Sequence, residues 1–289
     1  MIVLEFKAYG KASQFSAIDE ALRTVQFVRN KALRFWMDGL GKTQYDLNKY
    51  CAVLAKEFPF VDELNSMARQ SAAERAWSAI SRFYENCKKQ ILGPKGYPQF
   101  QKDNRSVEYK TCGWKLADDR KTITFTDKKN IGRLKLKGTR DLNYYSLDQI
   151  KRVRLVKRAD GYYVQFCIRI DREEEIEPSG KAIGLDVGLN HFYTDSNAET
   201  VDNPRFLRRG IKRLRQAQRR VSRRVKGSKN RGKARVILGK RHLKISRQRK
   251  DHAVKLARCV ITSNDVVAYE DLRIKNMAKN HCLAKSIND

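Results

Sequence analysis

Two acidic residues, Asp186 and Glu270, lie within apolar runs of the sequence, and this setting favours catalytic chemistry. Asp186 belongs to "AIGLDVGLN" and Glu270 to "VVAYEDL", and we predict that both runs form core strands of one domain. If these strands are neighbours, both carboxylates reach the same end of the sheet. Two like charges so close raise one pKa or require a cation, and Mg²⁺ prefers such oxygen ligands. If the protein also binds phosphates, the pair indicates metal-assisted phosphodiester hydrolysis, in which two ions activate a water and stabilise the leaving oxygen.

A second interpretation of the same residues stays open. Asp186 can be a turn residue, and Glu270 can be an acid at a helix N-terminus, a role that Asp271 could fill instead. A buried carboxylate without a cation or a set of hydrogen bonds costs free energy. Either Asp186 has a partner, or its strand is not buried.

The chain carries a large excess of positive charge, which favours a polyanionic partner. Its 289 residues include 62 Lys and Arg against 32 Asp and Glu, a net charge of +30. Residues 203–255 hold 22 of these bases and one acid, Asp251, so that this stretch has a net charge of +21. Such a density repels itself unless phosphates neutralise it, which indicates nucleic-acid contact. The candidate phosphate-binding residues, chosen for local density, are Arg215, Arg219, Arg220, Arg223, Arg224, Lys226, Lys229 and Arg231.

The basic stretch has the periodicity of helices. Leu207, Ile211 and Leu214 begin one apolar face, "KGSKNRGK" interrupts it, and apolar residues resume the pattern from Ala234. We predict a helical hairpin over 203–255. The hairpin is inserted between three short strands, in "AIGLDVGLN", "HFYTD" and "AETV", and a fourth, buried strand in "SNDVVAYEDL".

The first 172 residues predict a β domain with helices inserted into it. "IVLEFKAY" is typical of a strand, residues 16–92 have helical spacing, and "LGPKGYPQFQK" ends the helices. Further strands are predicted in "SVEYK", "TITFT", "GRLKLKG" and "VRLVKRADGYYVQFCIRI", the last a hairpin with an Asp160-Gly161 turn. Because the first strand has no partner nearby, we expect it to join this later sheet. The β domain is then 1–15 with 93–172, followed by an acidic linker at 173–180.

Cysteine usage and hydropathy exclude several classes of protein. The six cysteines contain no CxxC pair, which predicts free thiols and argues against a zinc site or a disulfide framework. No run of about 18 apolar residues occurs. Glu5 and Lys7 interrupt the first apolar stretch, unlike a signal peptide. We therefore expect a cytoplasmic protein without membrane contact.

Several stretches resemble one known family. They are "GLDVGLN", "NPRFLRRGIKRLRQAQRRVSRR", "KGSKNRGKARVIL", "RQRKDHAVKLA", "VVAYEDLRIKNMAKNH" and "LAKSIND", with "VRNKALRFW" and "GYPQFQK" nearer the N-terminus. These stretches resemble the TnpB family, the transposon-encoded, OrfB-type relatives of type V CRISPR effectors. The resemblance covers nearly the whole chain, and it is most specific from Lys181 to Asp289.

The resemblance implies an RNA-guided DNA endonuclease with an α+β multidomain fold. Residues 1–15 and 93–172 would form a β-barrel wedge domain, and 16–92 a helical recognition domain. Residues 181–289 would form a partial RuvC-like domain of the RNase H type, with the basic hairpin inserted.

The resemblance also implies roles and partners. Asp186 matches the first metal-binding aspartate of the family, and Glu270 matches its catalytic glutamate, with Mg²⁺ as the shared cofactor. The expected partners are a guide RNA derived from the transposon end and double-stranded target DNA. The expected location is the prokaryotic cytoplasm, in association with the nucleoid.

The sequence departs from the family pattern at its end. The family continues past "LAKSIND" with a zinc ribbon of two CxxC pairs and a DRDxNAA-like segment that supplies a third carboxylate, and neither motif is present here. Asp289 is no substitute, because it matches the start of a later helix. We therefore expect an incomplete and inactive nuclease. The alternatives are a nuclease-dead, RNA-guided DNA binder and a general basic RNA-binding protein without guide preference.

Overall fold

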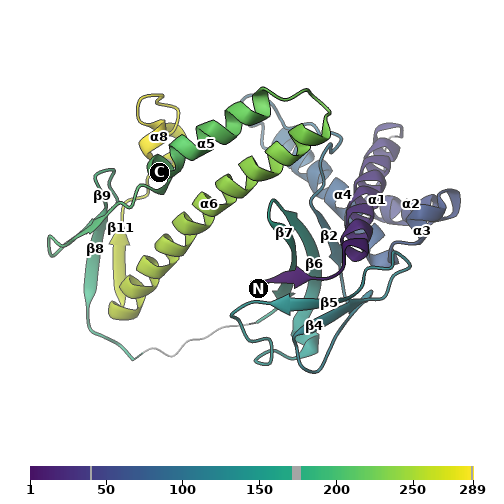
Figure 1. The fold of residues 1–289 in the computed structure, drawn as a ribbon, viewed down its shortest axis with the longest axis horizontal. Coiled ribbons are helices and arrows are strands. Elements are labelled where there is room, and N and C mark those ends of the chain that lie inside the picture. Colours follow the sequence, from purple (N-terminus) through teal and green to yellow (C-terminus); the bar gives the residue numbers. More distant parts are fainter. Residues whose placement is uncertain (40, 171–176, 288) are drawn as a thin grey trace. The chain divides into compact units, whose positions relative to one another are not determined.

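The computed structural model describes residues 1–39, 41–170, 177–287 and 289. These residues form two compact units, Met1–Arg172 and Glu173–Asp289 (Figure 1). The acidic linker predicted at 173–180 lies outside the described residues as far as residue 176.

A seven-stranded antiparallel sheet forms much of the first unit. Its strands are β1 (Ile2–Tyr9), β2 (Ser106–Tyr109), β3 (Trp114–Leu116), β4 (Thr122–Phe125), β5 (Gly132–Lys137), β6 (Ile150–Arg158) and β7 (Gly161–Ile168). The order across the sheet is β2-β6-β7-β1-β5-β4-β3, so β1 lies between β7 and β5. This confirms that the first strand joins the later sheet. Only β3 has no counterpart among the predicted strands.

Strands β6 and β7 form the predicted hairpin, with its turn shifted by one residue. Arg158 pairs with Gly161, so the two loop residues are Ala159 and Asp160. Gly161 has a φ of +136°, a region that glycine adopts without steric cost. The Asp-Gly signal therefore identifies the hairpin but misplaces the turn.

Four helices are inserted between β1 and β2: α1 (Ala12–Met37), α2 (Gln44–Glu57), α3 (Pro59–Asp62) and α4 (Ser66–Lys88). α1 and α4 pack against β2 of the sheet, and α2 and α3 pack against the other helices. A short 3₁₀ turn, η1, spans Leu147–Gln149. Ile18 of α1 and Ile80 of α4 are fully buried and share one core with Val107 and Phe166 of the sheet. The side chain of Asn65 begins α4 by accepting hydrogen bonds from backbone N–H groups. Helical periodicity and capping together account for this layer.

The second unit contains a four-stranded sheet with a long helical hairpin inserted in it. Its strands are β8 (Ala182–Asp186), β9 (His191–Asp195), β10 (Thr200–Asp202) and β11 (Val266–Tyr269), in the order β10-β9-β8-β11. Its helices are α5 (Phe206–Ser222), α6 (Lys229–Ser263), α7 (Ile274–Met277) and α8 (Ala284–Ile287). The four predicted strands and the inserted hairpin are all present, and the chain is a mixed α+β protein.

Two features of the second unit correct the predictions. β11 is not a buried strand: Val266 is 60% exposed and Tyr269 is 71% exposed. β11 is the edge of its sheet, and an apolar run is buried only where another layer covers it. The "KGSKNRGK" turn is also shorter than predicted, because Ser228 accepts a hydrogen bond from the N–H of Arg231 and begins α6.

All six cysteines are free thiols. None of the helices in the described part of the chain is long and apolar enough to cross a bilayer.

Candidate functional site

The two candidate carboxylates stand at the same end of two neighbouring parallel strands. β11 pairs with β8 in parallel, and the last register pair joins Leu185 to Tyr269. Asp186 and Glu270 each follow that pair by one residue. Neighbouring strands lie about 4.8 Å apart, so the two backbone positions are adjacent. The structure therefore fulfils the geometric condition that the sequence raised for this pair.

The exposure of Asp186 and Glu270 explains how a carboxylate can follow an apolar run. Asp186 and Glu270 are both exposed, and the strand that carries Asp186 is only half-buried between its ends. An exposed carboxylate keeps its hydration and needs no buried counter-ion. Of the two possibilities that the sequence left open, the strand is therefore not buried.

Asp265 fixes the register that brings the two carboxylates together. Its side chain accepts hydrogen bonds from the backbone N–H groups of Ser179 and Gly180, at 2.8 and 2.7 Å, and from the Ser179 hydroxyl at 2.9 Å. The hydrogen bonds from Ser179, backbone and side chain, lower the pKa of Asp265. Its own backbone N–H donates to the Lys181 carbonyl at 2.9 Å. Asp265 thus joins the start of β11 to the start of β8.

The carboxylate pair suits a hard divalent cation in the type of its ligands. Carboxylate oxygens are the side-chain ligands that Mg²⁺ prefers. Across the ranges that the structure describes, no group of three His, Cys, Asp or Glu residues gathers. Asp289 lies elsewhere: its side chain accepts hydrogen bonds from the N–H groups of Leu207 and Arg208, at the start of α5, at 2.6 and 3.0 Å.

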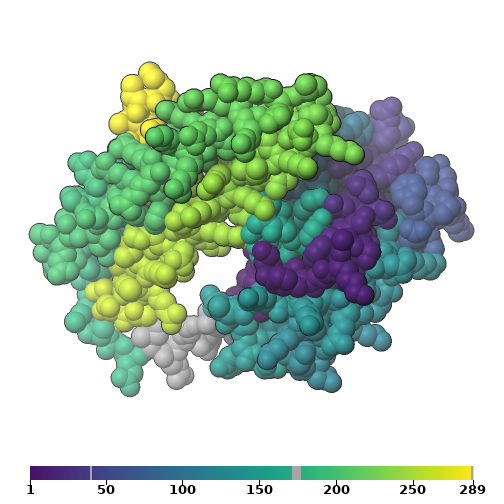
Figure 2. All heavy atoms as spheres, in the orientation of Figure 1, coloured from purple at the N-terminus to yellow at the C-terminus, as the bar shows by residue number. Residues whose placement is uncertain are grey.

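The basic hairpin forms a groove between α5 and α6. The groove has a volume of about 720 Å³, and six arginines line it: Arg213, Arg219, Arg220, Arg223, Arg224 and Arg241. Figure 2 shows the two helices as one continuous surface, green for α5 and yellow-green for α6. Guanidinium groups gathered in this way match the geometry and charge of phosphates.

The structure separates the predicted nucleic-acid-binding residues into three places. Arg219, Arg220, Arg223 and Arg224 line the groove, whereas Arg215 is exposed on α5 and does not line it. Lys226 and Lys229 are exposed at the turn, and Arg231 donates a side-chain hydrogen bond to the Arg224 carbonyl at 3.1 Å.

Two lining residues, Arg213 and Arg241, were absent from the prediction. Arg213 lies seven residues before Arg220 and therefore on the same face of α5, which helical spacing could have shown. Arg241 comes from α6, and its position depends on how the two helices pack.

Close packing of the two helices shapes this groove. Ala217 and Val221 of α5 and Ala234 and Ile245 of α6 are buried. A Cβ atom added at Gly210 would lie 2.9 Å from Cδ1 of Ile245. Glycine at position 210 therefore allows α5 to approach α6 closely, and this approach sets the spacing of the arginines.

The part of the chain that holds these residues is similar to known proteins. Residues 165–281 match a family model, OrfB_IS605, described as "Probable transposase". A protein of Streptomyces pristinaespiralis named "Putative RNA-guided DNA endonuclease" is 28% identical, over 99% of this chain and 70% of that protein. "Putative RNA-guided DNA endonuclease InsQ" of Escherichia coli (strain K12) is 23% identical, over 64% of this chain and 44% of that protein.

Among solved structures, this chain is similar to a chain of a CRISPR-Cas12f ternary complex. The similarity covers 90% of this chain and 63% of that chain. The match has a TM-score of 0.32 and a sequence identity of 14%. The resemblance drawn from the sequence motifs is confirmed by the family model and the curated relatives.

Proposed function

We propose that this chain, a TnpB-like member of the OrfB_IS605 transposase family through residues 165–281, is an RNA-guided DNA-binding protein of endonuclease type. In this proposal, Asp186 and Glu270 hold Mg²⁺ beside the bound nucleic acid. The observation that carries it is the placement of these two carboxylates at adjacent positions, one residue beyond the pair of Leu185 and Tyr269. A turn residue and a helix-capping acid would have no reason to meet at one end of a sheet.

The chain's own residues would bind and orient the nucleic acid. The groove arginines of α5 and α6 would contact backbone phosphates, which fix position without reading sequence. Asp265 would hold the strands that carry the carboxylates in register. Mg²⁺, when bound, would activate a water and stabilise the leaving oxygen of a phosphodiester.

We assign the remaining parts of the chain by the same resemblance. Residues 1–15 and 93–172 would be the wedge domain, and 16–92 the helical recognition domain. Residues 181–289 would be the RuvC-like domain. The partners would be a guide RNA from the transposon end and a double-stranded DNA target, within the cytoplasm and at the nucleoid.

A second candidate function, binding without cleavage, is favoured by one observation. Within the described residues, no third His, Cys, Asp or Glu completes a group with Asp186 and Glu270 that could hold a metal ion. Cleavage by two bound ions needs more anionic ligands than one carboxylate pair supplies. We therefore expect the 289-residue polypeptide to bind its target and not to cut it.

One experiment tests both candidates. The chain is mixed with guide RNA transcribed from the flanking DNA, a matching DNA duplex and Mg²⁺, and both binding and cleavage are measured. We expect guide-dependent binding without cleavage. Cleavage that is lost in Asp186→Asn and Glu270→Gln, but kept in Asp271→Asn, would reject the second candidate and support a complete nuclease. Equal binding with and without guide RNA would reject RNA guidance and favour a general RNA-binding protein.

A further inference from the structure

A separate polar pocket lies wholly within the first unit, between α4 and the strands β2 and β6. Its volume is about 490 Å³. The lining residues that matter here are Arg75 of α4, Glu108 of β2, and Arg152 and Arg154 of β6. None of these residues belongs to the carboxylate pair or to the basic groove, so the pocket needs an explanation of its own.

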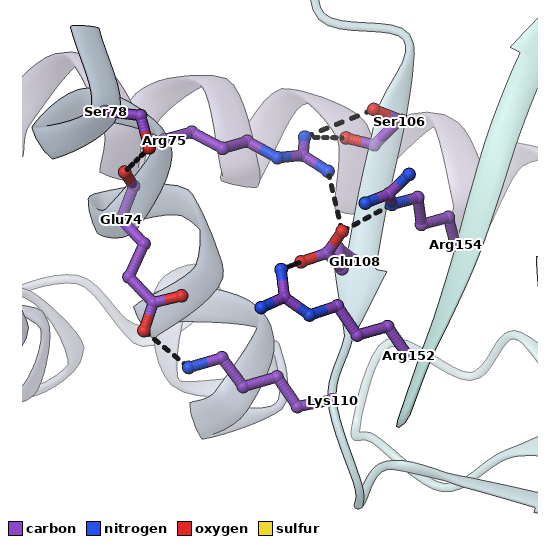
Figure 3. A network of polar contacts seen from close by, with 8 residues as sticks. All are labelled: Glu74, Arg75, Ser78, Ser106, Glu108, Lys110, Arg152 and Arg154. Carbon is purple, nitrogen blue, oxygen red and sulfur yellow. Dashed lines mark hydrogen bonds and ion pairs between the residues drawn. The ribbon is translucent and has the colours of Figure 1, made fainter. Parts of the chain in front are cut away.

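Three arginines converge on one carboxylate in this pocket (Figure 3). Glu108 is 5% exposed; Arg152 Nη1 lies 3.0 Å from its Oε1, and Arg154 Nε donates to its Oε2. Arg75 Nη2 lies 4.0 Å from the same Oε2. Burial alone would raise the pKa of Glu108, but the hydrogen bond from Arg154 and the three guanidinium charges hold it below its ordinary value. Glu108 is therefore ionised and orients the arginines.

One carboxylate does not neutralise three guanidinium groups, so the cluster has an excess of two positive charges. The neighbouring acid, Glu74, is already paired with Lys110. Burial lowers the pKa of Arg75, the charge of Glu108 partly offsets this, and the charges of Arg154, Arg29 and Arg152 lower the pKa further. The positive charges therefore oppose one another, and a bound anion would relieve this repulsion.

We propose that this pocket binds a phosphate group, held by Arg75, Arg152 and Arg154. Each guanidinium presents parallel N–H donors that match two phosphate oxygens. The side chains of Arg152 and Arg154 are 43% and 34% exposed, so a phosphate of a nucleic-acid strand can reach them. The molecule that carries this phosphate is a nucleic acid, and the phosphate belongs to its backbone. This choice of carrier rests on the proposed function.

Inorganic phosphate tests the site without any assumption about the carrier. The full chain is treated with phenylglyoxal in phosphate or in chloride at equal ionic strength, and modified arginines are located by mass spectrometry. We expect phosphate to slow modification of Arg152 and Arg154 several-fold. Arg23, which is 71% exposed on α1 and outside the pocket, is the matched control. Equal rates in both salts, or equal slowing at Arg23, would overturn the site.

Nucleic-acid binding then tests the carrier. Arg152→Gln and Arg154→Gln are compared with Arg23→Gln for binding to RNA and to DNA of the same sequence over a range of salt. Loss of one phosphate contact lowers the slope of log affinity against log salt by about 1. We expect this change of slope in both pocket variants. If it occurs with RNA, the bound nucleic acid is RNA, and if it occurs with DNA, the bound nucleic acid is DNA.

Unchanged slopes with both strands, despite protection by phosphate, would reject nucleic acid as the carrier and leave the phosphate site. A failure of guide-dependent DNA binding together with protection by phosphate would reject the proposed function and also leave the site. Because Arg152 and Arg154 are partly exposed, folded variants are expected, and circular dichroism checks this.

Discussion

At the scale of single residues, the two sites use carboxylates in opposite ways. Glu108 is buried and surrounded by guanidinium groups, so its charge organises a cationic pocket. Asp186 and Glu270 are exposed at the end of two strands, where their charges remain available to a cation. The same side-chain type therefore serves as an internal counter-ion in one unit and as a candidate ligand pair in the other.

Neutralising Glu108 should destabilise the first unit. In Glu108→Gln the three arginines lose their common counter-ion, and because they keep partial contact with water, we expect a loss of about 2–4 kcal/mol in unfolding free energy. Urea unfolding of both proteins at pH 7 measures this difference. Glu20→Gln, on the exposed surface of α1, is the control and should change little.

The same substitution predicts a dependence on pH. The folded pKa of Glu108 is lowered, so its stabilisation is complete above the unfolded value, about 4.3, and is lost as pH falls through the folded pKa. The difference between wild type and Glu108→Gln should therefore shrink when the unfolding is repeated near pH 3. A difference that persists undiminished at low pH would show that the charge of Glu108 is not its source.

At the scale of elements, the sequence predicts where strands and helices lie better than it predicts whether they are buried and what they pack against. Alternation and turn residues indicate the strands from β4 to β7, because these signals are local. The exposure of β11 could not be predicted, since it depends on the place of the strand in the sheet. The cluster around Glu108 was missed for a similar reason: its β6 partners are 44 and 46 residues away in sequence.

The carboxylate pair could be predicted from the sequence because the signals for it are local. Each acid directly follows a recognisable strand pattern, so only the parallel pairing of β8 with β11 had to be added. The groove was found only in part, because charge density identifies a basic helix but not the face that meets its partner helix.

The α5–α6 groove should depend on the small residue at position 210. Gly210→Leu places a large side chain against Ile245, and overpacking of this kind costs about 1–3 kcal/mol. We expect a lower unfolding free energy for the second unit and weaker nucleic-acid binding. Ile245→Ala in the same chain should restore part of both. If the double variant is no better than Gly210→Leu, this contact does not set the helix spacing.

Asp265 should control the pairing of β8 with β11. Asp265→Ala removes the acceptor of the Ser179 and Gly180 hydrogen bonds, so we expect faster amide exchange in the paired segment from Val266 to Tyr269. Because the pKa of Asp265 is lowered, its contribution is present above about pH 4 and disappears at lower pH. Asp271→Ala is the control, and equal exchange in the two variants would contradict this role.

At the scale of the whole molecule, positive charge is distributed over two distinct kinds of surface. The hairpin of α5 and α6 offers many exposed arginines and should supply most of the salt-dependent affinity. The pocket around Glu108 offers few groups in fixed orientation and should hold a single phosphate. A nucleic-acid-binding protein can use the first surface for attraction and the second for position.

The groove gives a prediction that separates geometry from charge density. Arg241→Gln removes a residue that lines the groove, whereas Arg215→Gln removes an equal charge from outside it. We expect Arg241→Gln to lower the salt slope of nucleic-acid binding by about 1 and Arg215→Gln to lower it less. Equal effects on the slope would mean that net charge, and not the groove, determines binding.

Paramagnetic broadening shows directly whether Asp186 and Glu270 form one cation site. Mn²⁺, which shares the preference for oxygen ligands, is added in small amounts to the full chain while amide NMR signals are recorded. We predict broadening centred on residues 185–187 and 269–271, retained in Asp271→Asn and lost in both Asp186→Asn and Glu270→Gln. Broadening centred elsewhere, or unchanged in those two variants, would contradict a shared site.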